Sequence, residues 1–92
     1  MGSNDDKDMT ELRGRALYRA DHRGTREMDF LLGKFAKARV PQMSGAQLDA
    51  FEELLAIPDP VLAGALIDGV GEFSEEMAAL IGSIRQFHSV KD

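Results

Sequence analysis

A cluster of charged residues around one glycine is the part of the sequence best suited to chemistry. The run of residues 21–29 places Arg23 and Arg26 on either side of Gly24, with Glu27 four residues after Arg23. On a continuous helix, residues four apart share a face, so Arg23 and Glu27 can form an ion pair. A glycine here can also end a helix, because it tolerates a positive φ, and it leaves room for another backbone. The pattern indicates either an ordinary helix junction or a corner that recognises a partner.

Catalytic and metal chemistry find little support in the remaining residues. The hydroxyl side chains fall in no nucleophile motif. The chain has no cysteine, and its two histidines, His22 and His88, are too few for a self-contained metal cage. A histidine beside Arg23 can shuttle protons, but at a helix end it more often caps carbonyl groups or faces solvent. Gly69-Val70-Gly71 is followed by acids, the wrong charge for a phosphate loop. We therefore predict no enzymatic activity, no metal and no stably bound cofactor.

Composition limits the chain to one small domain with an uneven charge distribution. It has 92 residues and a net charge of −5. Residues 13–39 carry a local charge of +5, whereas residues 40–84 contain eight acids and no base. The arginine-rich half and two helices about a glycine leave a small nucleic-acid-binding regulator as an alternative. The overall acidity argues against it, because nucleic-acid binders of this size usually carry a basic excess.

Apolar periodicity predicts an all-α fold, a compact bundle of about five short helices. Asp8 with Glu11 resembles a capping box, which predicts a first helix over residues 9–22 and leaves residues 1–8 as a disordered acidic tail. Arg13, Arg15 and Arg19 are expected on the polar side of that helix. Residues 9–92 are then expected to form one helical-bundle domain. No run approaches the roughly 20 apolar residues of a membrane span.

Four more helices follow from stop and start signals along the rest of the chain. A second helix follows Gly24 and ends at Val40-Pro41. Ser44 to Gln47 is a capping box that begins the third helix, and Ile57-Pro58 ends it. Asp59 as N-cap and Pro60 at the first helical position predict the fourth, broken by Gly69 and Gly71. Ser74, followed by two glutamates, begins the fifth. The expected inner positions are Met28, Leu31, Leu32, Phe35, Ala36, Met43, Leu48, Phe51, Leu55, Met77, Leu80, Ile81, Ile84 and Phe87.

The motif region and its surroundings resemble a known family. The run from His22 to Ala36, HRGTREMDFLLGKFA, is similar to the signature of the succinate dehydrogenase assembly factors, the bacterial SdhE and mitochondrial flavinylation-factor group. The similarity extends in order and spacing over about residues 10–88. The further agreement comes from Leu12 and Tyr18 upstream, from Leu48, Phe51, Leu54 and Leu55 before Pro58-Asp59-Pro60, and from the apolar last helix.

The resemblance implies a five-helix assembly factor that is not itself an oxidoreductase. Such a factor binds the flavoprotein subunit of succinate dehydrogenase, and possibly of fumarate reductase, and promotes covalent attachment of FAD to a histidine of that partner. The FAD would thus belong to the partner and not to this chain. Arg23, Gly24 and Glu27 match the family's Arg-Gly-x-x-Glu motif, which implies that they face the partner. The expected partner-binding residues are His22, Arg23, Gly24, Arg26, Glu27 and Asp29.

Several relatives carry a tryptophan where this chain has Ala65, which puts contacts from the fourth helix in doubt. We expect a cytoplasmic bacterial protein that is a monomer when free and binds no nucleic acid.

Overall fold

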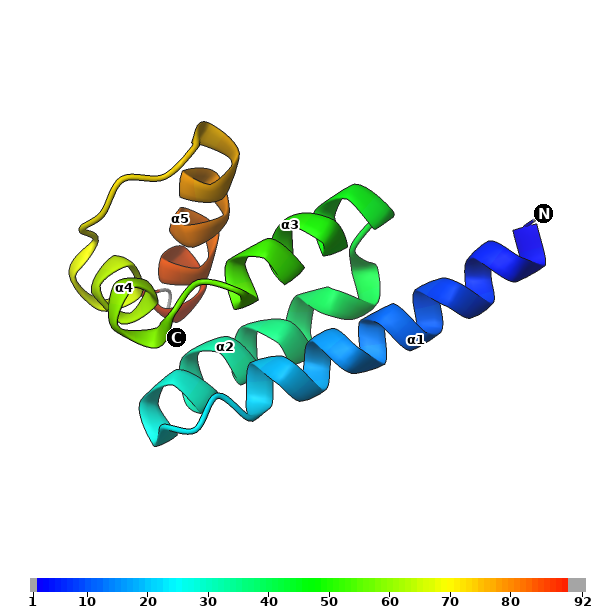
Figure 1. Ribbon diagram of the computed structural model, residues 1–92, viewed down its shortest axis with the longest axis horizontal. Helices are drawn as coiled ribbons and strands as arrows, with labels where there is room; N and C mark the ends of the chain where they lie inside the picture. The colour runs from blue at the N-terminus through cyan, green and yellow to red at the C-terminus, as the bar shows by residue number, and fades with distance from the viewer. Residues whose placement is uncertain (1, 90–92) are drawn as a thin grey trace.

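Five α-helices make up the fold, in a computed structural model that describes the backbone of residues 2–89 and the side chains of residues 9–89 (Figure 1). The all-α prediction is confirmed, and no strand occurs between residues 2 and 89. Met1 and residues 90–92, which fall within the predicted tail and domain, lie outside the described residues. The helices are α1 (Gly2–Asp21), α2 (Arg26–Arg39), α3 (Gly45–Leu55), α4 (Asp59–Ala63) and α5 (Glu75–Ser89).

Helices α1 and α2 form an antiparallel hairpin, and the end of α1 that carries the N-terminus extends past the other helices (Figure 1). Small buried side chains at Ala16 and Ala20 line the contact on α1, and Gly33 lies opposite on α2. A Cβ atom on Gly33 would lie 2.5 Å from the Asp21 carboxylate, so the glycine allows the helices to approach closely. The hairpin therefore fixes where the chain turns between residues 21 and 26.

The first helix begins earlier than its capping signal indicated. α1 starts at Gly2, seven residues before the expected start, so Asp8 lies inside the helix and not at its N-cap. A capping box marks a favourable place for a helix to begin, but it does not prevent the helix from extending further back. The division into a disordered tail over residues 1–8 and one domain over residues 9–92 stays a prediction.

Two predicted helix starts are confirmed in atomic detail. Ser44 accepts a hydrogen bond from the backbone N–H of Gln47, whose side chain accepts one from the Ser44 N–H, so the capping box of α3 is complete. Ser74 accepts from the Met77 N–H at 3.1 Å and begins α5. α2 ends where expected and continues into a 3₁₀ turn, Val40–Gln42. Local sequence was enough at these points, because the capping partners are only three residues apart.

The start of α4 differs from the prediction. Pro58 is the N-cap, and Asp59 is already the first helical residue, with no side-chain capping bond. The Asp59 carboxylate instead bonds to Arg23, 36 residues earlier in the chain. After Ala63 the helix widens into one π-helical turn, Gly64–Asp68, and ends at Gly69, whose φ of 72° is left-handed. The predicted stop at this glycine is confirmed.

The hydrophobic core joins all five helices. Phe35 of α2 and Phe51 of α3 lie at its centre with ring centroids 6.0 Å apart, and Phe87 of α5 meets Phe35 edge-on at 5.6 Å. Met28, Met43 and Met77 are buried, as the helical pattern predicted. The other buried members are Ala16, Ala20, Leu32, Ala36, Val40, Leu48, Leu54, Leu55, Leu62, Ala65, Leu66, Ile81 and Ile84. Leu31, Leu80 and Phe87 are partly buried against this core.

Ala65 faces this core and not the surface, with only 1 % of its area exposed. Its pocket is shared with Phe73 and Ile81, so in this chain position 65 contributes packing between the π-helical turn and α5.

None of the helices within residues 2–89 is long and apolar enough to cross a membrane.

Candidate functional site

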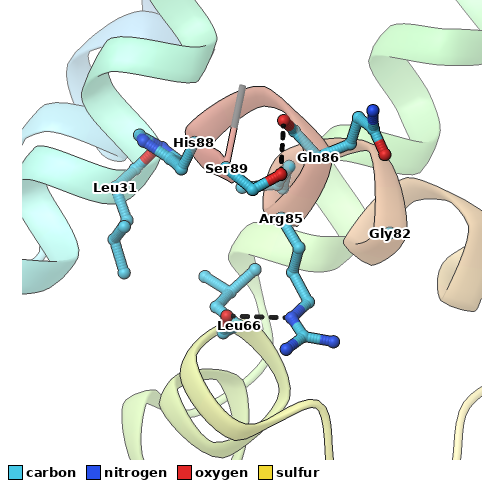
Figure 2. Close-up of a pocket in the computed structure, with 8 residues that line it drawn as sticks. Leu31, Leu66, Gly82, Arg85, Gln86, His88 and Ser89 are labelled. Atoms are coloured by element: carbon cyan, nitrogen blue, oxygen red, sulfur yellow. Dashed lines mark hydrogen bonds between the residues drawn. The ribbon is translucent and has the colours of Figure 1, made fainter. Parts of the chain in front are cut away.

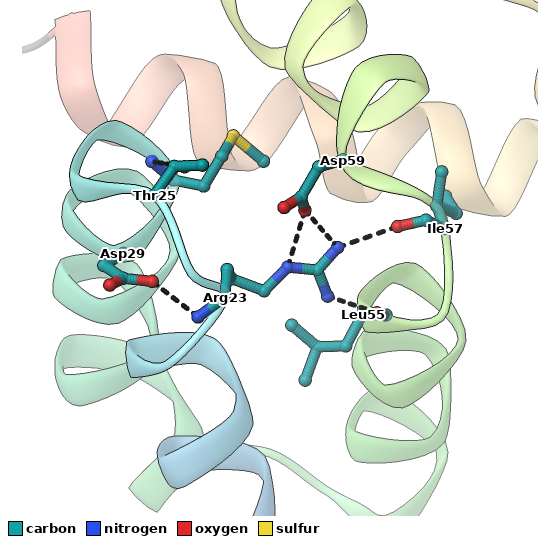
Figure 3. Close-up of polar contacts among 7 residues, drawn as sticks. Arg23, Thr25, Asp29, Leu55, Ile57 and Asp59 are labelled. Carbon is teal, nitrogen blue, oxygen red and sulfur yellow. Dashed lines mark hydrogen bonds and ion pairs between the residues drawn. The ribbon is translucent and has the colours of Figure 1, made fainter.

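The turn between α1 and α2 is held by two of its own residues, Gly24 and Thr25, and by Asp29 in the first turn of α2. Gly24 has a φ of 108°, a backbone conformation that residues other than glycine rarely adopt. Thr25 is the N-cap of α2, and its hydroxyl accepts a hydrogen bond from the Met28 N–H at 3.3 Å. The Asp29 carboxylate accepts a hydrogen bond from the backbone N–H of Arg23 (Figure 3). Asp29, which is half-buried, therefore holds the turn through a contact within the chain.

The Arg23 side chain points from this turn to the junction of α3 and α4 (Figure 3). Its Nε donates to Asp59 Oδ1 at 3.0 Å, and Nη2 reaches the same oxygen at 2.7 Å. Nη2 also donates to the carbonyl oxygen of Ile57 at 2.8 Å, and Nη1 donates to that of Leu55. Only 12 % of the side chain is exposed. Its guanidinium group therefore has three partners inside the protein.

The expected pair of Arg23 with Glu27 is wrong, because Arg23 is engaged with Asp59. The expectation assumed a continuous helix, but residues 22–25 are not helical and Gly24 turns the chain. Glu27 remains exposed in the first turn of α2, where a carboxylate interacts favourably with the helix dipole. Arg26 is exposed beside it. The motif thus divides into an internal arginine and an external glutamate.

Beside Arg23 and its three partners Leu55, Ile57 and Asp59, which we call the Arg23 fork, lies an open depression. It has a volume of about 410 Å³ and is lined by the end of α1 and the α3–α4 junction. Tyr18 and His22 stack on one wall with ring centroids 3.9 Å apart, and 64 % of Tyr18 is exposed. His22 Nδ1 lies 2.8 Å from the Tyr18 carbonyl oxygen, the carbonyl-capping role expected of a helix-end histidine. Residues 56–58 form the other side.

The structure gathers the predicted site residues into two groups. His22 and Arg23 line the depression, while Arg26 and Glu27 lie on the exposed first turn of α2. Gly24 is exposed between them, and a Cβ atom there would meet nothing within 4 Å. Sequence reasoning missed Asp59, which it interpreted as a helix cap. Its only local signal was a carboxylate without a matching base nearby, since residues 40–84 contain none.

Most of the basic residues in the first half of the chain make contacts within the protein. Arg13 and Arg19 were expected on a polar face, but both are half-buried, with Arg13 donating to the Met43 carbonyl and Arg19 pairing with Glu52. Lys37 pairs with Asp21, and Arg39 lies over the rings of Phe35 and Phe87. These contacts compete with phosphate binding, so no observation favours the nucleic-acid alternative.

A second depression, at the C-terminal end of α5, has a volume of about 500 Å³ (Figure 2). Arg85 Nε donates to the Leu66 carbonyl oxygen at 3.2 Å, and His88 Nε2 lies 2.7 Å from that of Leu31. These bonds tie α5 to the π-helical turn and to α2. The polar groups here thus serve packing between helices.

These features define a class: a small helical protein whose polar site is an open surface depression framed by two turns. The family model described as "Flavinator of succinate dehydrogenase" matches residues 14–88. The chain belongs to this family, as its resemblance indicated. The match includes both turns and every residue of the Arg23 fork.

Individual relatives agree with the family assignment. The chain is 44% identical over 50 residues to the FAD assembly factor SdhE of Acetobacter pasteurianus, a match covering 54% of this chain and 46% of the relative. It is 30% identical over 90 residues to the mitochondrial succinate dehydrogenase assembly factor 2 of Dictyostelium discoideum, covering 98% of this chain and 63% of the relative. The matches thus span less than two thirds of either relative. No solved structure matches the chain significantly.

Proposed function

We propose that this protein is an assembly factor that binds the flavoprotein subunit of succinate dehydrogenase in the bacterial cytoplasm and promotes covalent attachment of FAD to a histidine of that subunit. The observation that carries the proposal is the family match over residues 14–88, which includes Arg23, Gly24 and Glu27 at the motif spacing. The names of the relatives support it. An action on fumarate reductase stays a prediction.

The proposed mechanism is selective binding and not chemistry by this chain. Attachment requires the partner's histidine to be oriented toward the flavin while developing charge is stabilised. A factor that prefers the flavin-loaded, pre-attachment conformation of the partner raises its population, in proportion to the difference between its affinities for the two conformations. The residues available for such binding are the exposed ones: Glu27, Arg26, the Gly24 turn and the Tyr18–His22 stack.

Glu27→Ala is expected to remove the acceleration of FAD attachment. The glutamate is exposed, so its loss removes a partner contact without opening the core. The measurement mixes the purified chain with the apo flavoprotein subunit and FAD, and follows in-gel flavin fluorescence after denaturation. Glu76→Ala is a matched control, because Glu76 is also an exposed acid in the first turn of a helix. A rate of FAD attachment that is the same with and without the wild-type chain would overturn the proposal.

Gly24 tests whether the partner's backbone approaches the turn. Both Gly24→Ala and Gly24→Arg must adopt a φ of 108°, at an expected cost of about 1–3 kcal/mol each. Only the arginine also fills the open space outside the turn. We expect near-normal helix content by circular dichroism in both variants, and loss of flavoprotein binding in Gly24→Arg beyond that in Gly24→Ala. Equal binding by the two variants would contradict a close approach.

A further inference from the structure

The strongest unassigned feature of the molecule is the carboxylate of Asp59. It lies at the start of α4, yet it caps no helix N–H and instead receives both Nε and Nη2 of Arg23. About 32 % of its side chain is exposed, against 12 % for Arg23, so the acid closes the outer side of the fork. Both donors reach the same oxygen, Oδ1, and together with the bonds to the Leu55 and Ile57 carbonyl groups they fix the orientation of the planar guanidinium group.

The fork connects two turns that are remote in sequence. Arg23 leaves the α1–α2 turn, and its remaining donors hold the carbonyl groups of Leu55 and Ile57 in the α3–α4 junction (Figure 3). One wall of the depression is the end of α1 with the first residues of the α1–α2 turn, including Tyr18 and His22, and the opposite wall is the α3–α4 junction, residues 56–58. The shape of that depression therefore depends on where the guanidinium group is held.

We propose that Asp59 is a positioning residue: it orients Arg23, and the pair holds the two turns so that the depression between them forms the surface on which the flavoprotein docks. The proposal rests on the proposed function for the identity of the partner. In this arrangement Arg23 acts from within the protein, and the exposed walls of the depression make the contact. Without Asp59, the guanidinium keeps its bonds to Leu55 and Ile57 but loses its ionic partner, so the α3–α4 junction is held less firmly against the α1–α2 turn.

The first test measures binding to the purified flavoprotein subunit, at a temperature where circular dichroism shows each variant folded. Asp59→Ala is expected to weaken binding by about tenfold or more, and Asp59→Glu, which keeps the carboxylate, to recover part of that loss. Asp68→Ala is the matched control, since it removes an exposed acid at the end of the same helical segment. Wild-type affinity in a folded Asp59→Ala variant would overturn the proposal.

A double-mutant cycle separates positioning from direct contact. If Asp59 acts through Arg23, the double variant Arg23→Ala/Asp59→Ala binds no more weakly than the weaker of the two single variants. If Asp59 contacted the partner independently, the two losses would add. Additive losses would therefore refute the positioning role, whereas a shared loss supports it.

A second measurement needs no partner. The amides of Arg23 and Ile57 are hydrogen-bonded, one in each turn, to Asp29 and to the Leu54 carbonyl. Asp59→Asn should raise hydrogen exchange at both, while the Met77 amide at the start of α5 keeps its wild-type rate. Unchanged exchange at Arg23 and Ile57, or an equal rise at Met77, would refute local positioning. If the wild-type chain does not bind the flavoprotein, the proposed function and the docking role fail, and exchange alone decides the positioning role.

Discussion

Replacing Arg23 with alanine is expected to lower the free energy of unfolding by about 2–3 kcal/mol. The change leaves the Asp59 carboxylate and the carbonyl groups of Leu55 and Ile57 without the donors that now satisfy them. The figure lies below that for breaking a fully buried pair, because Asp59 can still be hydrated from its exposed side. Urea unfolding followed by circular dichroism measures the loss.

Arg26→Ala provides the comparison for that measurement. Arg26 carries the same charge three residues later but is exposed in the first turn of α2, where a cation opposes the helix dipole. Its removal is expected to change the free energy of unfolding by no more than about 0.5 kcal/mol. Arg23→Lys should recover only part of the loss, since an ammonium group lacks the planar fork. Equal unfolding midpoints for Arg23→Ala and Arg26→Ala would contradict the internal role of Arg23.

Phe51→Ala is expected to have the largest effect on stability, a loss of about 3–5 kcal/mol. Phe51 is fully buried on α3 and packs against Phe35 of α2. Its truncation leaves a cavity between the Phe35 side of α2 and α3. The loss is large because the total free energy of unfolding of a small domain is only about 5–15 kcal/mol. Each kcal/mol lowers the melting temperature of a domain this size by about 4–8 °C, so a thermal scan detects the change readily.

Phe30→Ala is the matched control for Phe51. The two substitutions remove the same atoms, but 54 % of Phe30 is exposed, where its ring contacts His88 and Lys34. Its truncation creates no enclosed cavity, so we expect a loss of about 1 kcal/mol or less. Similar melting temperatures for the two variants would mean that Phe51 does not occupy the centre of the core.

Several features of the fold follow from the sequence alone because their causes are local. The capping box of Ser44 and Gln47, the stop at Gly69 and the apolar stripe of α5 each depend on residues within one or two helical turns. Such short-range patterns fix where most helices begin and end, and which faces turn inward. The family was also recognisable, because order and spacing over about 80 residues carry it.

The internal partners of the motif were decided only by the tertiary structure. Arg23 has Glu27 as its nearest complementary residue after the turn, yet it pairs with Asp59, 36 positions away, because Gly24 ends the helical geometry on which the local pairing depends. Asp59 likewise has the sequence position of a cap but the role of a long-range ion partner. The sequence by itself determined the number of helices, most of their ends and the motif. The packing of the end of α1 and the α1–α2 turn against the α3–α4 junction decided that Arg23 faces inward, while Glu27 stays exposed on α2.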